Sequence, residues 1–149
     1  MLAALKLDFR QFTFVDLGSG KGRTLMMAAE YPFRRIVGVE LIPELHRIAE
    51  ANLKRLPLAG RQCSSFECLC MDASGYVFPP EPAVVYLFNP FPEGVFERVM
   101  ANLGRSLAEL PRELYIVYHN PLLERVVARS EAFRKIGGTH QYVVYKAKG

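Results

Sequence analysis

The sequence lacks any apolar segment long enough to cross a membrane as a helix. Its longest unbroken apolar run, residues 83–88, is far shorter than the roughly 20 residues that a membrane-spanning helix needs. The apolar residues at positions 2–5 are too few for the core of a secretory signal peptide. With 149 residues, 50% of them hydrophobic, the chain is long enough for one core and too short for two domains. We therefore expect a single domain over residues 1–149, without a membrane partner and located in the cytoplasm.

A strong charge of one sign and paired cysteines are also missing. The chain has 19 Lys and Arg against 15 Asp and Glu, a net charge of +4, and its basic residues are scattered rather than gathered in a block. Solvated helix faces produce this pattern as readily as a nucleic-acid partner does. Cys63, Cys68 and Cys70 lack C-x-x-C spacing and a nearby histidine, so we expect reduced, buried thiols and no metal site.

Short apolar segments alternate with segments of helical periodicity along the whole chain. No linker, repeat or low-complexity tract interrupts them. The segments 83–88 and 114–118 are apolar on both faces, as strands covered by helices on each side must be. The pattern predicts an α/β fold with a mostly parallel sheet. The predicted strands are residues 12–17, 36–40, 66–71, 83–88 and 114–118.

Apolar residues at helical spacing predict the helices between these strands. Pro43 suits the first turn of one helix, and Pro111 ends another before the next strand. Near the C-terminus, Gly137 and Gly138 permit positive φ and predict the turn of a closing antiparallel hairpin. The predicted helices cover residues 22–31, 43–56, 95–107 and 121–130, and the predicted hairpin strands cover residues 133–136 and 141–145.

A glycine-rich loop follows the first predicted strand. Three glycines at alternate positions let the backbone turn sharply, approach a ligand closely and direct helix N-terminal N–H groups toward it. The nucleoside-triphosphate loop would need Lys and then Ser or Thr after its last glycine, and Gly22 is followed by Arg23. The dinucleotide fingerprint would need glycine at position 23. What remains is the pattern D-x-G-x-G-x-G, which consists of Asp16, Gly18, Ser19, Gly20, Lys21 and Gly22 around Leu17.

This pattern resembles the first motif of class I S-adenosylmethionine-dependent methyltransferases. The resemblance implies a Rossmann-like, doubly wound, seven-strand sheet with a C-terminal antiparallel hairpin, and S-adenosyl-L-methionine as the cofactor. It also implies that the glycine loop, with Asp16 and Ser19, holds the methionine end of the cofactor. Two alternatives stay open: a nucleoside-binding regulatory module without turnover, and an NAD-binding domain, which Arg23 disfavours.

Acidic residues end the second and third predicted strands. A carboxylate at Glu40, followed by Leu41, can accept hydrogen bonds from both hydroxyls of a ribose. The resemblance implies that Asp72 accepts from the adenine amino group and that the backbone N–H of Ala73 meets the ring. We therefore predict these four residues to be cofactor contacts.

The fourth predicted strand leads into Asn89, Pro90 and Phe91. In amino-methylating members of the family, an Asn or Asp followed by two prolines and an aromatic residue holds the target nitrogen. Here the aromatic residue comes one position early. We still predict Asn89, Pro90 and Phe91 on the acceptor side, with Asn89 also at the cofactor, and an amino group as one candidate acceptor.

His119 ends the fifth predicted strand, at the edge where open parallel sheets bind ligands. An imidazole can take a proton near neutral pH, so His119 is a candidate general base, although a polar strand end is the more common role of such a residue. The acceptor stays open: a small molecule, a protein or a nucleic acid. Only residues 1–11 precede the first strand, so we expect an open cofactor cleft that a partner or an upstream segment covers.

Overall fold

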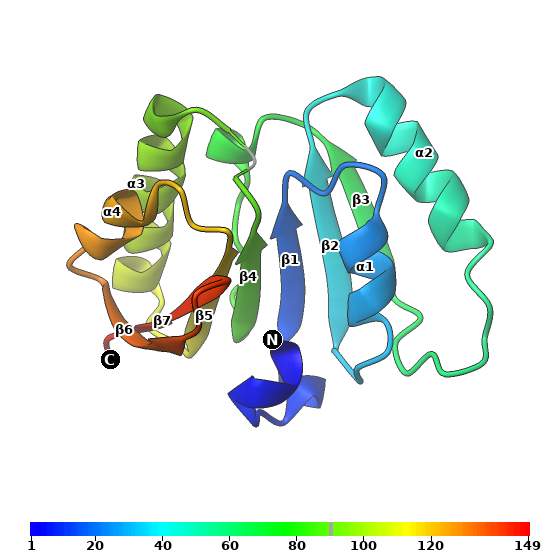
Figure 1. Cartoon of the computed structure of the whole chain (residues 1–149), viewed down its shortest axis with the longest axis horizontal. Helices are drawn as coiled ribbons and strands as arrows, with labels where there is room; N and C mark the ends of the chain where they lie inside the picture. The colour runs from blue at the N-terminus through cyan, green and yellow to red at the C-terminus, as the bar shows by residue number, and fades with distance from the viewer. Residues whose placement is uncertain (90) are drawn as a thin grey trace.

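One mixed sheet runs through the centre of the chain in its computed structural model, which describes residues 1–89 and 91–149 (Figure 1). Within those residues the strands are β1 Thr13–Leu17, β2 Arg35–Glu40, β3 Phe66–Cys70, β4 Ala83–Leu87, β5 Leu114–His119, β6 Phe133–Gly138 and β7 Tyr142–Ala147. Their spatial order is β3-β2-β1-β4-β5-β7-β6. Strands β1 to β5 pair in parallel, and β7 pairs antiparallel with both β5 and β6. The predicted doubly wound, mostly parallel seven-strand sheet is confirmed.

Helices cover both faces of this sheet (Figure 1). None of those in the described part of the chain is long and apolar enough to span a membrane. The α-helices are α1 Arg23–Ala28, α2 Pro43–Lys54, α3 Glu93–Glu109 and α4 Glu124–Ala128, and the 3-10 turns are η1 Leu2–Leu5, η2 Phe9–Gln11 and η3 Ala73–Gly75.

Two clusters of buried side chains make up the core, because neighbouring residues of a strand point to opposite faces. Phe14 of β1 packs with Leu25 of α1, whereas the next residue, Val15, belongs to the cluster that contains Phe96 of α3. Helices α1 and α2 therefore cover one face of the sheet, and α3 and α4 cover the other.

The predicted turn of the closing hairpin is wrong. Gly137 and Gly138 lie inside β6, and the turn follows them, closed by a hydrogen bond from Thr139 N to Tyr142 O of 2.8 Å. A Cβ on Gly138 would lie 2.4 Å from Tyr142 O, and its φ is +140°. Glycine is needed at position 138 because the two strands approach closely there, and not because the chain reverses there.

The cysteine prediction is confirmed only in part. All three thiols are free, but only Cys63 is buried, while Cys68 is half-buried and Cys70 is exposed. Cys68 and Cys70 belong to β3, which is an edge strand with a neighbour on one side only. An edge strand leaves side chains open to solvent that a central strand would bury.

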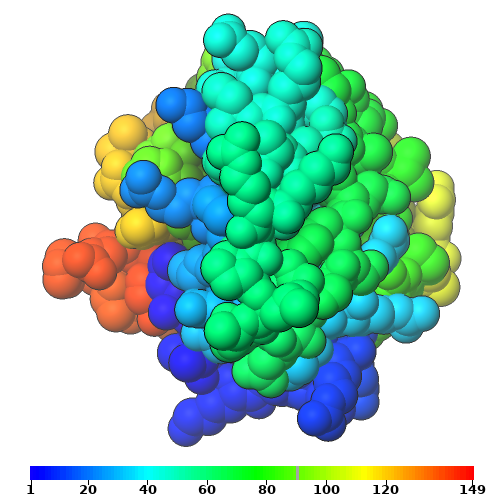
Figure 2. All heavy atoms as spheres, turned by 90° about the vertical axis from the view of Figure 1, so that its right-hand side faces the viewer, coloured from blue at the N-terminus to red at the C-terminus, as the bar shows by residue number. Residues whose placement is uncertain are grey.

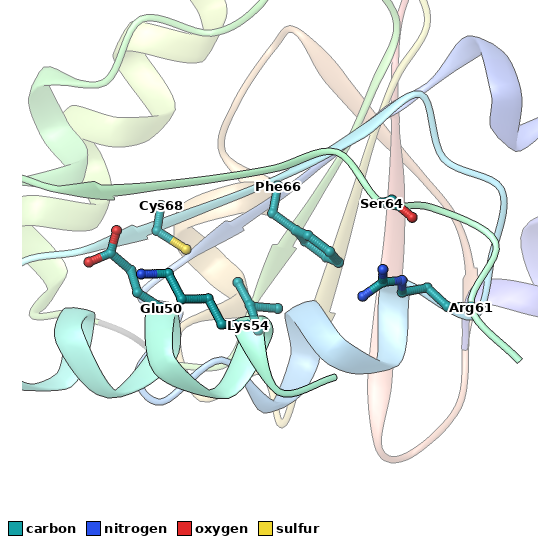
Figure 3. A pocket seen from close by; sticks show the side chains of 7 residues that line it. Glu50, Lys54, Arg61, Ser64, Phe66 and Cys68 are labelled. Carbon is teal, nitrogen blue, oxygen red and sulfur yellow. The ribbon is translucent and has the colours of Figure 1, made fainter. Parts of the chain in front are cut away.

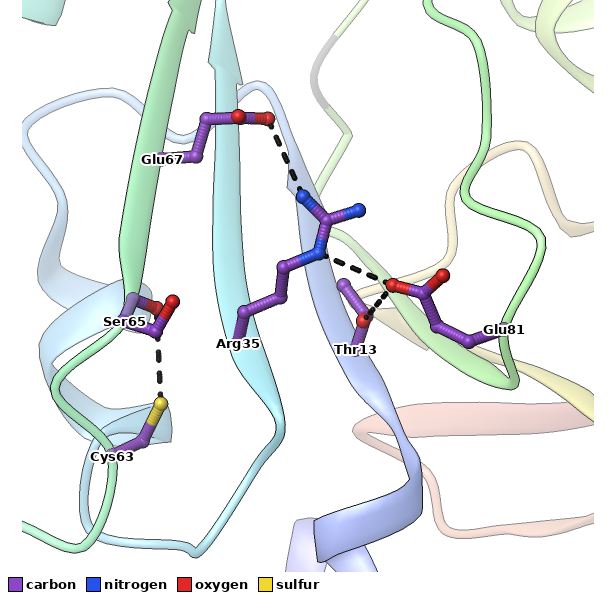
Figure 4. Close-up of polar contacts among 6 residues, drawn as sticks. All are labelled: Thr13, Arg35, Cys63, Ser65, Glu67 and Glu81. Carbon is purple, nitrogen blue, oxygen red and sulfur yellow. Dashed lines mark hydrogen bonds and ion pairs between the residues drawn. The ribbon is translucent and has the colours of Figure 1, made fainter.

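Polar groups at the amino ends of the first strands are paired with one another (Figure 4). The Thr13 hydroxyl donates to Glu81 Oε1 at 2.8 Å, and Arg35 Nε donates to the same oxygen at 3.2 Å. Arg35 Nη1 also lies 3.8 Å from Glu67 Oε1. This set, which we call the amino-edge network, ties β1, β2 and β3 to the segment that precedes β4.

Residues 1–11 also lie at the amino ends of the strands. Figures 1 and 2 both place this segment at the bottom of the molecule, opposite the end at which the parallel strands finish. Leu2 is buried in the cluster on the α1 face. The segment therefore supports the base of the sheet and does not reach the predicted cleft.

Candidate functional site

The glycine loop between β1 and α1 has the conformation that only glycines adopt readily. Gly18, Gly20 and Gly22 have φ values of +83°, +56° and +88°. Gly22 is the N-cap of α1, and a Cβ there would lie 3.2 Å from Ala49 Cβ of α2. Positive φ turns the backbone, and the missing Cβ lets α1 begin against α2. A further glycine, Gly38 of β2, makes room for the loop, because its Cβ would lie 2.9 Å from Ser19 Oγ.

Glu40, the last residue of β2, is hydrogen-bonded to this loop through its carboxylate. The residue is 8% exposed, Oε1 accepts from Gly20 N at 2.8 Å, and Oε2 accepts from Ile42 N at 2.9 Å. Each carboxylate oxygen has two acceptor sites, so both oxygens can take a further hydrogen bond. Glu40 thus organises the loop after β1 and the start of α2 and still presents an acceptor surface to a ligand.

One pocket, which we call the Glu40 pocket, brings half of the ten predicted cofactor residues together. Its volume is about 330 Å³. It lies against the carboxyl ends of β1, β2 and β3 and the start of α3. Leu41, at its rim, is 62% exposed. The predicted residues that line it are Gly18, Glu40, Leu41, Asp72, Ala73 and Phe91, joined by Val39, Ile42, Leu45, Met71, Pro92 and Val95.

Asp72 caps the turn η3 at one side of the Glu40 pocket. Its Oδ1 accepts from Ser74 N at 2.9 Å and from the Ser74 hydroxyl at 2.8 Å. These two hydrogen bonds lower the pKa of Asp72, so the exposed carboxylate is ionised at neutral pH. The second carboxylate oxygen has no hydrogen-bond partner among the described residues, and it can accept from a ligand.

A second pocket, which we call the His119 pocket, lies between the glycine loop and the ends of β4 and β5. Its volume is about 370 Å³, and Gly18 lines both this pocket and the Glu40 pocket. The predicted residues that it gathers are Asp16, Gly18, Ser19 and His119, joined by Lys21, Arg23, Thr24, Tyr86 and Phe88.

Asp16 is the most strongly perturbed carboxyl group in the site. It is 3% exposed, and burial, followed by the negative charge of Glu40, raises its pKa to about 8. Neither Asp16 nor Glu40 forms an ion pair with a basic side chain of the described residues. Two neighbouring buried carboxyl groups without a cation favour the binding of a positively charged ligand.

The predicted acceptor residues separate in the structure. Asn89 braces the ends of β4 and β5: its Oδ1 accepts from the Tyr118 hydroxyl at 2.6 Å, and its Nδ2 donates to Asn120 O. Asn89 lines neither of the two pockets. Phe91 lines the Glu40 pocket and packs edge-on against Phe96 with ring centroids 5.6 Å apart. Pro90 lies outside the described residues, and the catalytic roles of all three residues stay predictions.

Tyr86 and Tyr118 are polar members of the site that the sequence did not predict. The Tyr86 hydroxyl lies 3.1 Å from His119 Nδ1, and the Tyr118 hydroxyl bridges Asn89 and the backbone N–H of Leu123. Both tyrosines sit within apolar strand segments, where an aromatic residue is usual. The only signal in the sequence that could have identified them is a hydroxyl group at a strand position that the sheet buries. A buried hydroxyl needs a hydrogen-bond partner, and that partner can be a residue of the site.

A third hollow is lined by residues of α2, of β3 and of the segment between them (Figure 3). Its volume is about 370 Å³, and it lies between α2 and the edge strand β3. The side chains of Phe66 and Arg61 point into this hollow (Figure 3). No predicted site residue lines it. The site therefore consists of the Glu40 pocket and the His119 pocket, which meet at Gly18.

The backbone is similar to those of several solved methyltransferases. The N-methyltransferase NodS from Bradyrhizobium japonicum, in complex with S-adenosyl-L-homocysteine, has a TM-score of 0.67 at 11% identity, over 93% of this chain and 79% of its own. The ribosomal protein L11 methylase from Lactobacillus delbrueckii has a TM-score of 0.63 at 15% identity, over 99% and 75%. Magnesium protoporphyrin IX methyltransferase from Synechocystis, with bound S-adenosylmethionine, has a TM-score of 0.60 at 10% identity, over 98% and 73%.

No protein-family model and no curated protein matches the sequence. Sequence identities this low carry no information about the acceptor, and the names of the three neighbours indicate different acceptors. What the neighbours share with this chain is the arrangement of the sheet and its helices. The chain therefore has the fold of class I S-adenosylmethionine-dependent methyltransferases, as the motif over residues 16–22 implied.

Proposed function

We propose that this protein is an S-adenosylmethionine-dependent methyltransferase. The observation that carries the proposal is the pair of buried carboxyl groups, Asp16 and Glu40, at the ends of adjacent strands, without a basic partner among the described residues. They flank a glycine loop with three positive φ angles. The structural neighbours support this function, and they support neither a regulatory module nor an NAD-binding domain.

The residues of the Glu40 pocket fit the nucleoside half of this cofactor. Glu40 can accept the two ribose hydroxyls while it keeps its bonds to Gly20 N and Ile42 N. Asp72 can accept from the adenine amino group, and the backbone of Ala73 lines the same pocket. Leu41, Phe91 and Val95 offer apolar surface to a flat ring.

The His119 pocket fits the charged half of the cofactor. When bound, S-adenosylmethionine supplies a methyl group on a positively charged sulfur. Asp16 can offset this charge and that of the amino group, because a cation beside Asp16 lowers its pKa and favours the carboxylate. The basic side chains of Lys21 and Arg23, which line the same pocket, can bind the carboxylate of the cofactor. Bound in this way, the cofactor would have its charged half next to the ends of β4 and β5, which border the same pocket.

Labelled cofactor tests this function directly. The purified protein is incubated with methyl-labelled S-adenosylmethionine and a cell lysate, and its affinity for S-adenosylhomocysteine is measured by calorimetry. We expect binding together with transfer of the label, and no binding of NAD. Tight binding without transfer would contradict turnover and favour the regulatory module, and NAD binding would contradict the cofactor assignment.

A second proposal concerns the cover of the site. Residues 1–11 lie at the opposite edge of the sheet, and Leu41 and Phe88 are exposed at the rims of the two pockets. We propose that a partner or an upstream segment covers this rim and excludes water from the reacting groups. Brisk turnover by the pure chain on a small acceptor would contradict it. A cytoplasmic location is a further proposal, and the three free thiols suit a reducing compartment.

A further inference from the structure

His119 has one ring nitrogen fixed and the other free. Its Nδ1 lies 3.1 Å from the Tyr86 hydroxyl, and its ring packs edge-on against Phe88 with centroids 4.8 Å apart. No side chain or backbone group of the described residues is hydrogen-bonded to Nε2. The ring is thus held from one side in a pocket that is open on the other.

Tyr86 is suited to position this ring and to accept a hydrogen bond from one of its nitrogens. The phenol is 5% exposed, and burial, followed by the charge of Asp16, raises its pKa, while a hydrogen bond with Thr24 opposes the rise. The hydroxyl is therefore neutral near pH 7 and can accept a hydrogen bond from Nδ1–H. A proton on Nδ1 leaves the lone pair of the neutral imidazole on Nε2.

We propose that His119 is the general base for a hydroxyl acceptor, and that Tyr86 is the residue that positions it. The proposal rests on the methyltransferase function proposed above. In this step the acceptor O–H gives its proton to His119 Nε2, and the oxygen forms a bond to the methyl carbon. The carbon–sulfur bond breaks, and its electron pair stays on sulfur, which becomes neutral.

A hydroxyl acceptor explains the placement of His119 better than an amino acceptor. A neutral amine already carries a reactive lone pair and needs positioning more than a base, whereas a hydroxyl is a weak nucleophile until it loses its proton. The group that would position an amine, Asn89, has both ends of its amide bonded within the chain. His119, by contrast, faces a pocket.

The residues that line the pocket restrict the class of acceptor further. Phe88 is 51% exposed beside His119 and offers its ring to a flat molecule. A phenol joins a flat ring to a hydroxyl that a histidine can deprotonate in the transition state. The structure thus favours a phenolic acceptor. The titratable and charged groups that face His119 in this pocket are Asp16, Lys21, Arg23 and Tyr86.

The tautomer of His119 is the first test, and it needs no turnover. Nitrogen-15 NMR of the wild-type protein resolves His46, His119 and His140, and the His119→Gln variant assigns the signal. We expect Nδ1–H in the wild type and a mixture of tautomers in Tyr86→Phe, because the Tyr86 hydroxyl is the hydrogen-bond partner that Nδ1 has among the described residues. An Nε2–H tautomer in the wild type would overturn the proposal.

Acceptor choice is the second test. Labelled S-adenosylmethionine is offered with simple phenols and with the matched anilines. We expect label on the phenols, a loss of about 100-fold in kcat for His119→Gln, and a smaller loss for Tyr86→Phe, because a general base contributes factors of this size. The affinity for S-adenosylhomocysteine should change by less than about twofold. The matched control is His140→Gln, in the exposed turn between β6 and β7, which should leave kcat unchanged.

The two proposals fail in different ways. Label on the anilines alone, no label on the phenols despite binding of S-adenosylhomocysteine, or full activity in His119→Gln would overturn the base assignment. Failure to bind either form of the cofactor would overturn the methyltransferase function, and the tautomer measurement would still decide how Tyr86 holds His119.

Discussion

The two edges of the sheet handle buried charge in opposite ways. At the amino edge, the Glu81 carboxylate is bonded to Thr13 and Arg35. At the carboxyl edge, Asp16 and Glu40 lie side by side without a basic partner in the described structure. A buried carboxylate that is paired and hydrogen-bonded is compatible with a stable fold, whereas one without a partner costs stability unless it takes up a proton or a ligand compensates its charge. The difference separates the edge that holds the sheet together from the edge that binds.

The pKa values of the two edges show the same contrast. Burial alone would raise the pKa of Glu81, but hydrogen bonds from Thr13 and Arg35 bring it below its ordinary value. Its contribution to stability is therefore present above the ordinary pKa and is lost as the pH falls through the lowered one. Asp16 behaves in the opposite sense: its pKa is raised to about 8, so stability is lost as the pH rises toward that value.

Of the variants considered, Asp16→Asn should have the largest effect, which is a change in the free energy of unfolding. The variant removes the cost of ionising a buried carboxyl group, so its free energy of unfolding at pH 8 should exceed that of the wild type, on the order of 3 kcal/mol. The difference should shrink toward pH 4, because Asp16 is protonated there in the native state and only partly ionised in the unfolded state. Urea unfolding at the two pH values measures it. Equal stability of both proteins at pH 8 would show that Asp16 carries no such cost. The matched control is Asp72→Asn, an exposed residue at the same edge, which should not stabilise.

Glu40→Gln should have the second largest effect, and this effect is a loss of affinity for the cofactor. The variant keeps one acceptor for the loop but loses the charge, and charged hydrogen bonds contribute about 1.5–3 kcal/mol each. We expect the affinity for S-adenosylhomocysteine to fall by about 10- to 100-fold, measured by calorimetry. Gln is preferred to Ala because Glu40 also holds Gly20 N and Ile42 N. Wild-type affinity in a folded variant would contradict the assignment of Glu40 to the ribose hydroxyls.

Thr13→Val should have the reverse effect of Asp16→Asn. The substitution preserves shape but removes the donor to Glu81 Oε1, which should lower the free energy of unfolding by about 1 kcal/mol and leave cofactor affinity unchanged. With one hydrogen bond fewer, the pKa of Glu81 should also rise, so stability is lost at a higher pH on acidification. Thermal unfolding between pH 3 and pH 7 measures both effects. A change in cofactor affinity would contradict the division between the two edges.

The carboxyl edge was predictable because each of its residues is read from a local pattern. A glycine repeat after an apolar strand predicts the loop, and the parallel sheet then brings Glu40, Asp72 and His119 to the same edge. Strand ends carry this information without any knowledge of side-chain contacts.

The contacts across strands were not predictable. The pairs Tyr86 with His119 and Tyr118 with Asn89 join residues of neighbouring strands, and they depend on register and side-chain rotamer. The hairpin turn failed for a related reason: Gly138 is required by the close approach of Tyr142 O, which no local pattern shows. The amino-edge network was missed because Glu81 lies in a segment without periodicity.

Asp72→Asn should have the smallest effect on binding, and it tests the adenine contact. Asn keeps an oxygen that can cap η3 through Ser74 N and another hydrogen-bonding group for the ligand, so only the charge is lost. Because Asp72 is exposed, solvent screens that charge, and we expect a loss of affinity for S-adenosylhomocysteine of roughly two- to fivefold.

The lowered pKa of Asp72 keeps it ionised at neutral pH, so the wild type should lose this advantage only as the pH falls below the ordinary range of an Asp. Calorimetry at pH 7 and at about pH 2.5, with the fold checked by circular dichroism, therefore separates the charge from the fold: the two proteins should differ at pH 7 and converge at the lower pH. Ser74→Ala is the control, since it removes a bond to Asp72 without touching the ligand-facing oxygen. A difference between Asp72→Asn and the wild type that persists unchanged in acid would mean that the substitution disturbs the turn, and that the adenine is held elsewhere in the Glu40 pocket.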